Sequence, residues 1–500
     1  MMQILTKSNY ILGLECPKYL WLKVNHPEKI KEPSVADKFR MEDGEKVGIE
    51  AKKLFPEGID LSMHKYNENP KKTKEALKEK KPLFEAGFEF NNLFSRADIL
   101  FPVDNEWDIV EVKASTKTKK VNIYDVAFQK YVYEGSGIKI RKCFILHLNK
   151  DYTKYANLNL EKLFEKEEIT KEVNELIDKI PERINNIIQF LSQKEPPKAG
   201  LILEIPFSDG SHDCKTENCL ELPENNVFCL YRCGKLGAEL YEKGIKLIKD
   251  ITEEIKLNAK QSIQRTCEKE GKVNVDKEKI KEFLDKLQYP LHYLDFETFN
   301  TAIPMFDGTR PYSQIPFQFS LHTVEKENGR LVHYEFLYNG KEDPRKDFIT
   351  ALNGSLGEKG TIIVYNQSFE INRMKELAVN FPEYKAWVEN IPLRTVDLLD
   401  IFREFSYYNP KQQGSASIKK VLPALTGKTY KGMAISDGGT ASVEFFNAHY
   451  TDTTQEKRKQ VREDLLKYCG LDTEAEIMII DKLRELVKEK LKLEVKSKND

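Results

Sequence analysis

The sequence predicts a multidomain α/β protein with two separate α/β regions, and three observations lead to this prediction. The chain has 500 residues, which is more than a single hydrophobic core usually serves. Strand-like and helix-like segments alternate up to about residue 197, and again from about residue 289 to about residue 486. A cysteine-bearing stretch and a lysine-rich helical stretch lie between them. We therefore expect domains at 1–220 and 288–486, a helical linker at 221–287 and a charged tail at 487–500.

The composition is that of a soluble protein, with 40% apolar and 32% charged residues. No long uncharged apolar stretch predicts a membrane-spanning helix, and the N-terminal residues lack the pattern of a secretory signal. We therefore expect a cytoplasmic protein without a membrane partner. The formal net charge of −1 gives no general attraction for nucleic acid, so any such contact has to come from local basic patches.

Two strand-like segments carry the first group of candidate catalytic residues. Asp98 lies in RADILF, and Glu111 and Lys113 lie in WDIVEVKAST, a hairpin away. Side chains alternate along a strand, so Glu111 and Lys113 are expected on one face. Carboxylates at Asp98 and Glu111 are hard oxygen ligands for Mg²⁺ or Mn²⁺, and Lys113 is placed to orient a water and offset developing charge.

Residues around this group extend the predicted site. Glu85 lies in the preceding strand-like segment LFEAGFEF, and Gln129 and Tyr133 lie on one face of a predicted helix. The loop that follows Lys113 is rich in lysine and predicts a local nucleic-acid-binding patch. Its candidate residues are Lys117, Lys119 and Lys120.

Asp98, Glu111-Val112-Lys113 and Gln129-x-x-x-Tyr133 resemble the motifs of RecB-type PD-(D/E)XK nucleases, including the CRISPR-associated RecB-like exonucleases. The resemblance implies a restriction-endonuclease-like fold, metal ligation by Asp98 and Glu111, and a catalytic Lys113. It further implies that Gln129 and Tyr133 contact DNA or water.

The first predicted helix departs from this family. Many RecB-type members carry a metal-binding histidine there, and the matching stretch MEDGEKVGIEAKKLF has none. Glu45 and Glu50 are the candidates to replace it.

The resemblance also implies an iron–sulfur cluster held by one early and three late cysteines. Only two of the late cysteines lie close together, so the fourth ligand is not fixed. The candidate ligands are Cys16, Cys214, Cys219, Cys229 and Cys233. The alternatives are a cluster that has been lost, or a Zn²⁺ site that uses cysteines and His212.

A second group of acids lies in the C-terminal region. Asp295 and Glu297 share one face of the strand-like segment LHYLDFETFN, and Glu370 begins a helix after a buried strand. Tyr468 and Asp472 are four residues apart on one helical face. Acids in this pattern suit two metal ions that cleave a phosphodiester, with Tyr468 orienting the water.

This second set resembles the DnaQ-like 3′–5′ exonucleases of the ribonuclease H-like fold, which implies catalytic Asp295, Glu297, Tyr468 and Asp472. It departs at the second motif, where Asn366-x-x-x-Glu370 stands in place of the usual Asn-x-x-x-Asp, and Asp397 is a nearby acid that offers compensation. The segment GSASIKKVLP supplies Lys419 and Lys420 as candidates for binding nucleic acid. Asn366 is a third candidate.

The order of these motifs along the chain resembles that of an uncharacterised prokaryotic family that fuses the two nuclease types. Residues 230–251, between the two motif sets, resemble a helix-hairpin-helix. The preferred interpretation is a Mg²⁺- or Mn²⁺-dependent DNA nuclease with two sites, acting on single-stranded or end-containing DNA in repair, processing or defence. Two alternatives stay open: only one site is active, or the chain is a catalytically silent nucleic-acid clamp.

Overall fold

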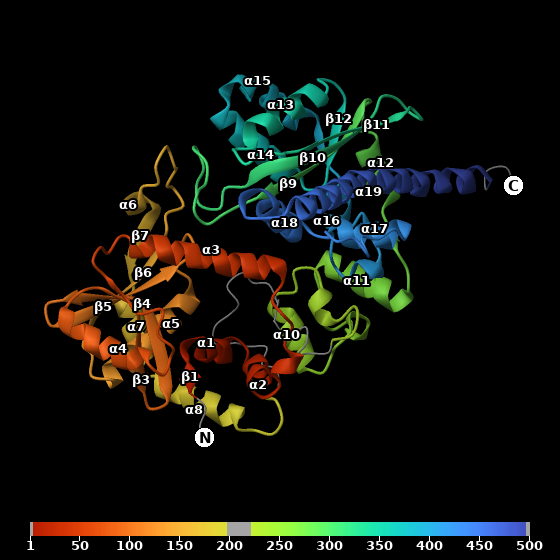
Figure 1. Cartoon of the computed structure of the whole chain (residues 1–500). Coiled ribbons are helices and arrows are strands. Elements are labelled where there is room, and N and C mark those ends of the chain that lie inside the picture. Colours follow the sequence, from red (N-terminus) through yellow and green to blue (C-terminus); the bar gives the residue numbers. More distant parts are fainter. Residues whose placement is uncertain (1–3, 198–221, 497–500) are drawn as a thin grey trace. The chain divides into compact units, whose positions relative to one another are not determined.

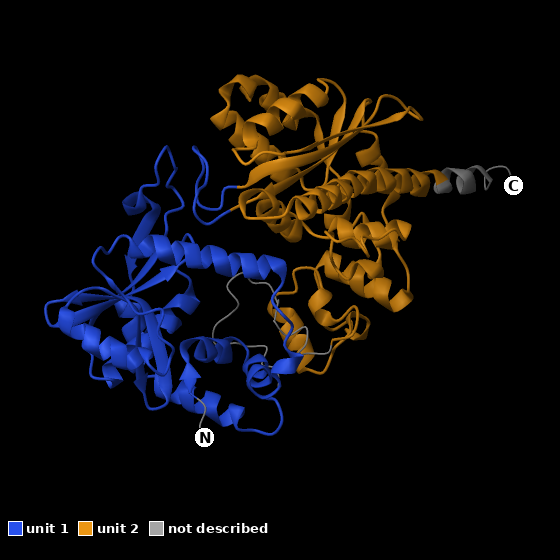
Figure 2. Ribbon diagram, in the orientation of Figure 1, with its two compact units in different colours: residues 1–221, 301–313 blue, residues 222–300, 314–500 orange. Residues whose placement is uncertain are grey.

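The computed structural model describes residues 4–197 and 222–496, and it shows a mixed α/β protein (Figure 1). The chain divides into two compact units (Figure 2). The first comprises residues 1–221 and 301–313, and the second comprises residues 222–300 and 314–500. The α/β class predicted from the sequence is therefore correct.

A seven-stranded sheet organises the first unit, with strands β2 to β7 in sequence order and β1 beside β4. The pairs β3–β4 and β4–β5 are antiparallel, as expected for segments a hairpin apart, and β5 pairs with β6 in parallel. The strands are β1 (Leu5–Thr6), β2 (Ile59–Asp60), β3 (Leu83–Phe90), β4 (Leu93–Val103), β5 (Glu106–Lys113), β6 (Ile140–Leu148) and β7 (Phe164–Glu168).

Helices cover both faces of this sheet. Side chains of β5 alternate between the two faces, and each face contributes to its own apolar core. Ile109 belongs to the core that contains Tyr10 of α1 and Phe128 of α5, whereas Val110 belongs to the core that contains Val47 of α3. Glu111, two residues after Ile109, therefore faces α1 and α5. The helices are α1 (Lys7–Glu15), α2 (Pro17–Asn25), α3 (Val35–Lys52), α4 (Asn69–Ala76), α5 (Lys120–Gly135), α6 (Leu160–Leu163), α7 (Thr170–Ile177) and α8 (Ile180–Leu191).

Residues 301–313 belong to the first unit although they connect two strands of the second. The Asp43 carboxylate on α3 accepts a hydrogen bond from the Ala302 backbone N–H at 2.6 Å, and the Tyr312 hydroxyl donates to the Ala114 carbonyl. Ala302 is also part of the apolar core beneath α3. Sequence position alone does not show this membership, because the segment lies far along the chain from its partners.

The described part of the predicted linker, residues 222–287, contains three α-helices joined by loops and a short strand, and it is part of the second compact unit. Strand β8 (Asn274–Val275) pairs with β14 (Tyr407–Tyr408), and the Gln264 amide donates to the Cys229 carbonyl at 2.9 Å. These contacts attach the linker to the C-terminal region. Its helices are α10 (Lys235–Glu242), α11 (Ala259–Glu270) and α12 (Lys277–Leu284).

A five-stranded sheet in the order β11-β10-β9-β12-β13 forms the centre of the second unit. Strand β10 is antiparallel to β9, whereas β12 lies parallel to β9 on its other side, so the strand order reverses at β9. The strands are β9 (Leu291–Phe299), β10 (Ile315–Val324), β11 (Leu331–Leu337), β12 (Thr361–Val364) and β13 (Thr395–Asp397).

Helices pack around this sheet, and the long α19 contacts both β9 and β10. The helices are α13 (Arg345–Ser355), α14 (Gln367–Asn380), α15 (Lys385–Asn390), α16 (Leu399–Arg403), α17 (Ile418–Thr426), α18 (Gly438–Tyr450) and α19 (Gln455–Lys496). Helix α19 thus continues into the charged segment that the sequence separates as a tail from residue 487. The short 3-10 helices of the chain are η1 (Pro27–Lys29), η2 (Leu77–Glu79), η3 (Val227–Cys229), η4 (Ile248–Asp250), η5 (Pro382–Tyr384), η6 (Pro392–Arg394) and η7 (Pro410–Gln412).

None of the helices within the described ranges combines the length and hydropathy required to cross a lipid bilayer.

Candidate metal centres

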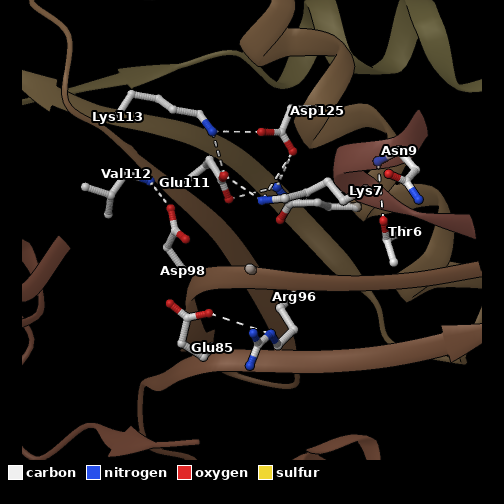
Figure 3. Close-up of polar contacts among 12 residues, drawn as sticks. Thr6, Lys7, Asn9, Glu85, Arg96, Asp98, Glu111, Val112, Lys113 and Asp125 are labelled. Atoms are coloured by element: carbon white, nitrogen blue, oxygen red, sulfur yellow. Dashed lines mark hydrogen bonds and ion pairs between the residues drawn. The ribbon is translucent and has the colours of Figure 1, made fainter. Parts of the chain in front are cut away.

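The first candidate centre lies where β4 and β5 meet α5 (Figure 3). The Lys113 ammonium is 2.7 Å from Oε1 of Glu111, so the prediction that these two side chains share one face is correct. The same ammonium is 2.7 Å from Oδ2 of Asp125, an acid on α5 that is not among the residues predicted from the sequence. Glu111 is 1% exposed, so Lys113 contacts a buried carboxylate.

Lys7 is a second cation in this centre, and no sequence motif marks it. Its ammonium lies 2.7 Å from Oε1 of Glu111 and 3.4 Å from Oδ1 of Asp125 (Figure 3). Lys7 begins α1, whose N-cap Thr6 accepts a hydrogen bond from the Asn9 N–H at 3.3 Å. No local motif marks Lys7, because it is separated from Glu111 by 104 positions.

Asp98 completes the acidic set of this centre. Its Oδ2 atom accepts a hydrogen bond from the Val112 N–H at 2.7 Å. Burial, together with the nearby charge of Glu111, raises the pKa of Asp98 to about 7. Glu85 lies near this group, 3.8 Å from Nε of Arg96, and burial raises its pKa as well.

Salt bridges with its own lysines dominate the charge balance of the first centre. Burial opposes ionisation of Asp125, but Lys113 and Lys7 hold the pKa of its carboxyl well below the usual range. Although burial favours neutral amines, the charges of Asp125 and Glu111 raise the pKa of both Lys7 and Lys113. The centre therefore contains strong internal ion pairs as well as candidate metal ligands.

Gln129 and Tyr133 are both fully buried, so neither side chain is open to solvent in this structure, and their contact with DNA or water stays a prediction. The Gln129 amide donates to Oε2 of Glu111 at 2.7 Å and to Oδ1 of Asp125 at 3.0 Å, which makes it a positioning residue. The Tyr133 hydroxyl donates to the Ala86 carbonyl at 2.5 Å and accepts from the Ala97 N–H at 2.6 Å. These two bonds place the Tyr133 hydroxyl between β3 and β4, away from the surface.

Glu45 and Glu50, the candidates to replace the missing histidine, both lie on α3. Glu45 is exposed, and Glu50 pairs with Lys53 at 2.5 Å. Of the predicted lysine patch, Lys117 and Lys120 are exposed, and Lys119 is half-buried at the N-cap of α5.

The second candidate centre is a compact group of three carboxylates. One oxygen from each of Asp295, Glu297 and Asp472 lies within 4.8 Å of the others. Among the residues that the structure describes, no other set of three acidic, histidine or cysteine side chains converges in this way. Asp295 and Glu297 share a face of β9, and Asp472 comes from α19, as the sequence predicts.

These carboxylates repel one another when no cation lies between them. Burial, and then the charge of Asp472, raises the pKa of Asp295 well above its usual value. The pKa of Glu297 is also raised well above its usual value, by burial and then by the charge of Asp295. Burial also raises the pKa of Asp472 to about 6, although a hydrogen bond from Tyr430 opposes the rise. A divalent cation would relieve this repulsion.

Two tyrosines and a lysine surround the second centre. Tyr430 donates to Oδ1 of Asp472 at 2.6 Å, and no sequence pattern had marked this residue. Lys419, predicted to bind nucleic acid, donates to the Tyr468 hydroxyl at 2.8 Å. Lys420 is exposed and contacts the side-chain oxygen of Gln413 at 2.7 Å. The two adjacent lysines therefore have different environments.

The second motif forms the turn between β12 and α14. Asn366 has a φ of 93°, a left-handed conformation that asparagine tolerates better than most residues. Asp397 accepts hydrogen bonds from the N–H groups of Asn366 and Leu399, at 2.8 and 3.1 Å, so one of its oxygens holds this turn. Glu370 is 2% exposed, and the charge of Asp295 contributes to the rise in its pKa after burial.

A cavity of about 450 Å³ opens onto the second centre. Asp295, Glu297, Asp472 and Glu476 line it together with Asn366 and Lys419. The cavity therefore gives a ligand access to the acids from the side that carries the lysine.

The cysteine predictions are only partly covered by the structure. Cys214, Cys219 and His212 lie outside the described residues. Cys16 is buried and caps α2, where its sulfur accepts from the Tyr19 N–H at 3.3 Å. Cys229 and Cys233 are half-buried and pack in a small apolar core with Val227. Cluster binding therefore stays a prediction.

Comparison with known proteins gives a match to a family described as a domain of unknown function, DUF2779, over residues 292–417. An uncharacterised protein of Mycoplasma pneumoniae is 32% identical over 221 residues, covering 40% of this chain and 33% of that protein. An uncharacterised protein of Mycoplasma genitalium is 31% identical over 229 residues, covering 42% of this chain and 34% of that protein.

A third relative, an uncharacterised protein of Ureaplasma parvum, is 27% identical over 226 residues, covering 41% of this chain and 32% of that protein. The chain thus matches about a third of the length of these curated relatives. The match to the domain of unknown function includes Asp295, Glu297 and Glu370, and it ends before Tyr468 and Asp472.

Proposed function

We propose that this protein is a metal-dependent nuclease that hydrolyses phosphodiester bonds of DNA. The observation that carries the proposal is the convergence of Asp295, Glu297 and Asp472 within 4.8 Å. These residues fit a divalent cation, because three closely spaced carboxylates, two of them buried, offer hard oxygen ligands and lack a matching number of cationic partners. Mg²⁺ or Mn²⁺ bound there would supply Lewis-acid activation of a phosphate and of a water.

The surrounding side chains support the same chemistry. Lys419 lines the cavity beside the acids and offers positive charge to a phosphate oxygen. Tyr468, held by Lys419 at 2.8 Å, is placed to orient a water molecule. Without metal, a cavity lined by carboxylates would repel a phosphodiester, so a catalytically silent nucleic-acid clamp is the weaker interpretation of this unit.

The position of the site in the sheet supports a ribonuclease H-like, DnaQ-type domain as the finer fold assignment. Asp295 and Glu297 lie on β9, where the strand order reverses, and Asn366 follows the carboxyl end of the neighbouring β12. Ligands of open α/β sheets bind at such a reversal point. The loop at Asn366 therefore lies at the expected edge of the sheet.

For the first unit we propose a PD-(D/E)XK nuclease fold with a second cleavage site. The proposal is supported by Asp98, Glu111 and Lys113 on adjacent antiparallel strands. The Lys7–Glu111 ion pair favours a second candidate, in which only the C-terminal site cleaves and the first unit binds DNA. DNA repair, processing or defence in the cytoplasm is the setting that such a nuclease suits.

A bound iron–sulfur cluster stays part of the proposal for the first unit, through Cys16 and the late cysteines. The ultraviolet–visible spectrum of the anaerobically purified protein tests it. A colourless sample without iron removes the cluster.

Digestion of end-labelled nucleic acids tests the nuclease proposal. The parent chain, Asp295→Asn and Lys113→Met are each incubated with single-stranded and double-stranded DNA and RNA, with Mg²⁺, Mn²⁺ or chelator. We expect metal-dependent DNA cleavage by the parent, loss of one activity in Asp295→Asn and loss of a separate activity in Lys113→Met. Glu463→Gln, an exposed acid on α19, is the matched control and should keep both activities.

The two candidate readings give different results in this assay. If only the C-terminal site cleaves, Asp295→Asn abolishes all cleavage and Lys113→Met retains it. A variant that carries both Asp295→Asn and Lys113→Met completes the set. If it digests DNA as fast as the parent, neither centre is a nuclease site and the proposal fails.

A further inference from the structure

A basic segment of the first unit, residues 63–81, has no role in the cleavage chemistry proposed above. It contains seven lysines and three glutamates, whereas the whole chain has a formal net charge of −1. The segment comprises part of the loop after β2, helix α4, η2 and the two lysines that follow η2. Positive charge concentrated in this way in a nearly neutral chain attracts phosphate groups locally.

The buried side of α4 is fixed to the sheet, and lysines occupy the opposite side. The Thr73 hydroxyl accepts a hydrogen bond from the Gly87 N–H of β3 at 3.0 Å. Together with Thr73, the buried residues of the helix are Asn69 and Ala76. The exposed lysines follow one another at steps of three and four residues, so they form a single stripe that faces solvent. This lysine stripe consists of Lys71, Lys74 and Lys78.

Acidic side chains of the described residues leave the lysine stripe uncompensated. Glu75, which lies within the same stretch of helix, pairs with Lys72 at 3.0 Å. Across residues 4–197 and 222–496, no ion pair involves a lysine of the stripe. The three ammonium groups are therefore available to an external anion.

The loop directly before α4 exposes two large apolar side chains. Met63 is 89% exposed, and Tyr66 is 56% exposed. The ring of Tyr66 packs at a steep angle against Phe94 of β4, with 6.0 Å between the ring centroids. Its position is therefore fixed while more than half of its side chain stays open to solvent. An exposed aromatic ring beside positive charge is the arrangement on which unpaired bases of a nucleic acid stack.

The basic segment is attached to the strands that carry the first candidate centre. The Asn69 amide donates to the carbonyl of Glu85 on β3 at 3.0 Å. Phe94, the partner of the Tyr66 ring, pairs in β4 with Thr6 of β1, and Lys7 of the first centre follows Thr6 directly. A strand of nucleic acid that reaches the first centre therefore has this surface within its path.

We propose that residues 63–81 bind a single-stranded stretch of DNA next to the first centre. The lysine stripe contacts its phosphates, and Tyr66 stacks on a base, which requires an unpaired strand. The inference rests on the proposed function, and it gives the first unit a binding surface that is separate from its acids and from the lysine loop after β5.

The salt dependence of DNA binding tests the lysine stripe. A fluorescent oligothymidylate is titrated with the full-length chain in chelator, and its anisotropy is followed at several salt concentrations. The test variant combines Lys71→Gln, Lys74→Gln and Lys78→Gln. The matched control removes the same charge from exposed positions elsewhere in the same unit, through Lys139→Gln, Lys171→Gln and Lys179→Gln.

Each phosphate contact to a single strand adds about 0.7 to the slope of log affinity against log salt concentration. We therefore expect the slope of the test variant to be smaller than that of the parent by about 2, and the control to keep the parent slope. Equal slopes for the two triple variants overturn the inference.

Tyr66→Ser tests the stacking contact, with Tyr155→Ser as its control because Tyr155 is 69% exposed in the same unit. We expect Tyr66→Ser to bind the oligothymidylate about ten-fold more weakly than the parent at one salt concentration. An affinity equal to that of Tyr155→Ser overturns the inference.

Vesicles that contain phosphatidylserine present the other polyanion that a basic surface attracts. Lysine-dependent binding to these vesicles by a parent chain that does not bind the oligothymidylate overturns the inference. Failure of the proposed function shows separately, as a parent that binds the oligothymidylate through the lysine stripe and cleaves no DNA with Mg²⁺ or Mn²⁺.

Discussion

The ammonium of Lys7 lies 2.7 Å from Oε1 of Glu111, the oxygen that Lys113 also contacts at 2.7 Å. Two lysines thus share one oxygen of a side chain that is 1% exposed. A divalent cation that binds Glu111 through this oxygen has to compete with both lysines. Lys7 is the one without a counterpart in the predicted Asp…Glu-x-Lys motif, and it therefore distinguishes the first centre from a simple metal site.

Replacing Lys7 with methionine should make the stability of the chain depend on divalent cations. The substitution leaves Glu111 and Asp125 with one lysine between them, and breaking a buried pair costs about 3 kcal/mol. That is the lower end of the usual range, because a fifth of the Lys7 side chain is exposed, at 20%. Thermal denaturation with and without Mn²⁺ measures the effect, and added Mn²⁺ should stabilise Lys7→Met more than the parent.

Lys117→Met is the control for this experiment, since Lys117 is an exposed lysine in the loop after β5. It should unfold at the parent temperature in both conditions. If Mn²⁺ shifts Lys7→Met and the parent equally, Lys7 does not compete with a cation at Glu111.

Much of the arrangement of both centres follows from local sequence patterns. Strand alternation places Glu111 beside Lys113 and Asp295 beside Glu297, and helical spacing places Tyr468 and Asp472 on one face of α19. These relationships depend on residues two to four positions apart. The sequence determines them wherever the element type is predicted correctly.

The residues missed from the sequence are those brought in by long-range packing. Lys7 reaches Glu111 across 104 positions, and Tyr430 reaches Asp472 across 42. Neither residue carries a motif, because a single lysine or tyrosine before an apolar segment is common. Tyr133 shows a different limit of local patterns. Its four-residue spacing from Gln129 places both on one helical face, but only the packing of the sheet decides whether that face meets solvent or lies against β3 and β4.

Tyr133→Phe should destabilise the first unit without changing the metal centre. The substitution removes the hydroxyl that links the Ala86 carbonyl to the Ala97 N–H, and it leaves both buried groups without that partner. We expect a loss of about 2 kcal/mol in the free energy of unfolding. Urea denaturation measures it, and Mn²⁺ titration should give the parent affinity. A variant of parent stability with reduced cleavage would instead support a direct role in the reaction.

Lys419→Met should slow DNA cleavage far more than Lys420→Met. Lys419 donates to Tyr468 beside the acids, whereas the adjacent Lys420 contacts Gln413 and is exposed. Removing a positioned cation of this kind costs about 100-fold in rate. Mn²⁺ should bind Lys419→Met at least as tightly as the parent, because a positive charge has been removed from the cavity.

Single-turnover cleavage rates at saturating metal measure this difference. A control change at Lys420 that slows cleavage as strongly would assign the effect to general attraction for DNA. Equal parent-like rates in both variants would exclude Lys419 from the reaction.

His322 on β10 should make folding of the second unit sensitive to mild acid. It is 4% exposed, one ring nitrogen lies 2.8 Å from Oγ1 of Thr473, and its ring stacks on His333 at 4.0 Å between centroids. Burial, with a contribution from His333, lowers the pKa of His322 to about 4. The unfolded chain, with a histidine pKa of about 6.5, binds this proton more tightly than the folded chain. The stabilisation is therefore complete above about pH 6.5 and is lost as the pH falls towards 4.

The predicted change is a loss of about 1 kcal/mol in the free energy of unfolding between pH 7 and pH 5.5. The carboxylates with raised pKa around Asp295 act in the opposite direction, so the quantity to compare is the pH dependence of the parent against that of His322→Gln. Urea denaturation at the two pH values gives both, and the variant should lack this part of the dependence because glutamine does not titrate. Parallel curves for the two proteins would show that His322 accepts its proton equally well in the folded and unfolded chains, which contradicts the burial seen in the structure.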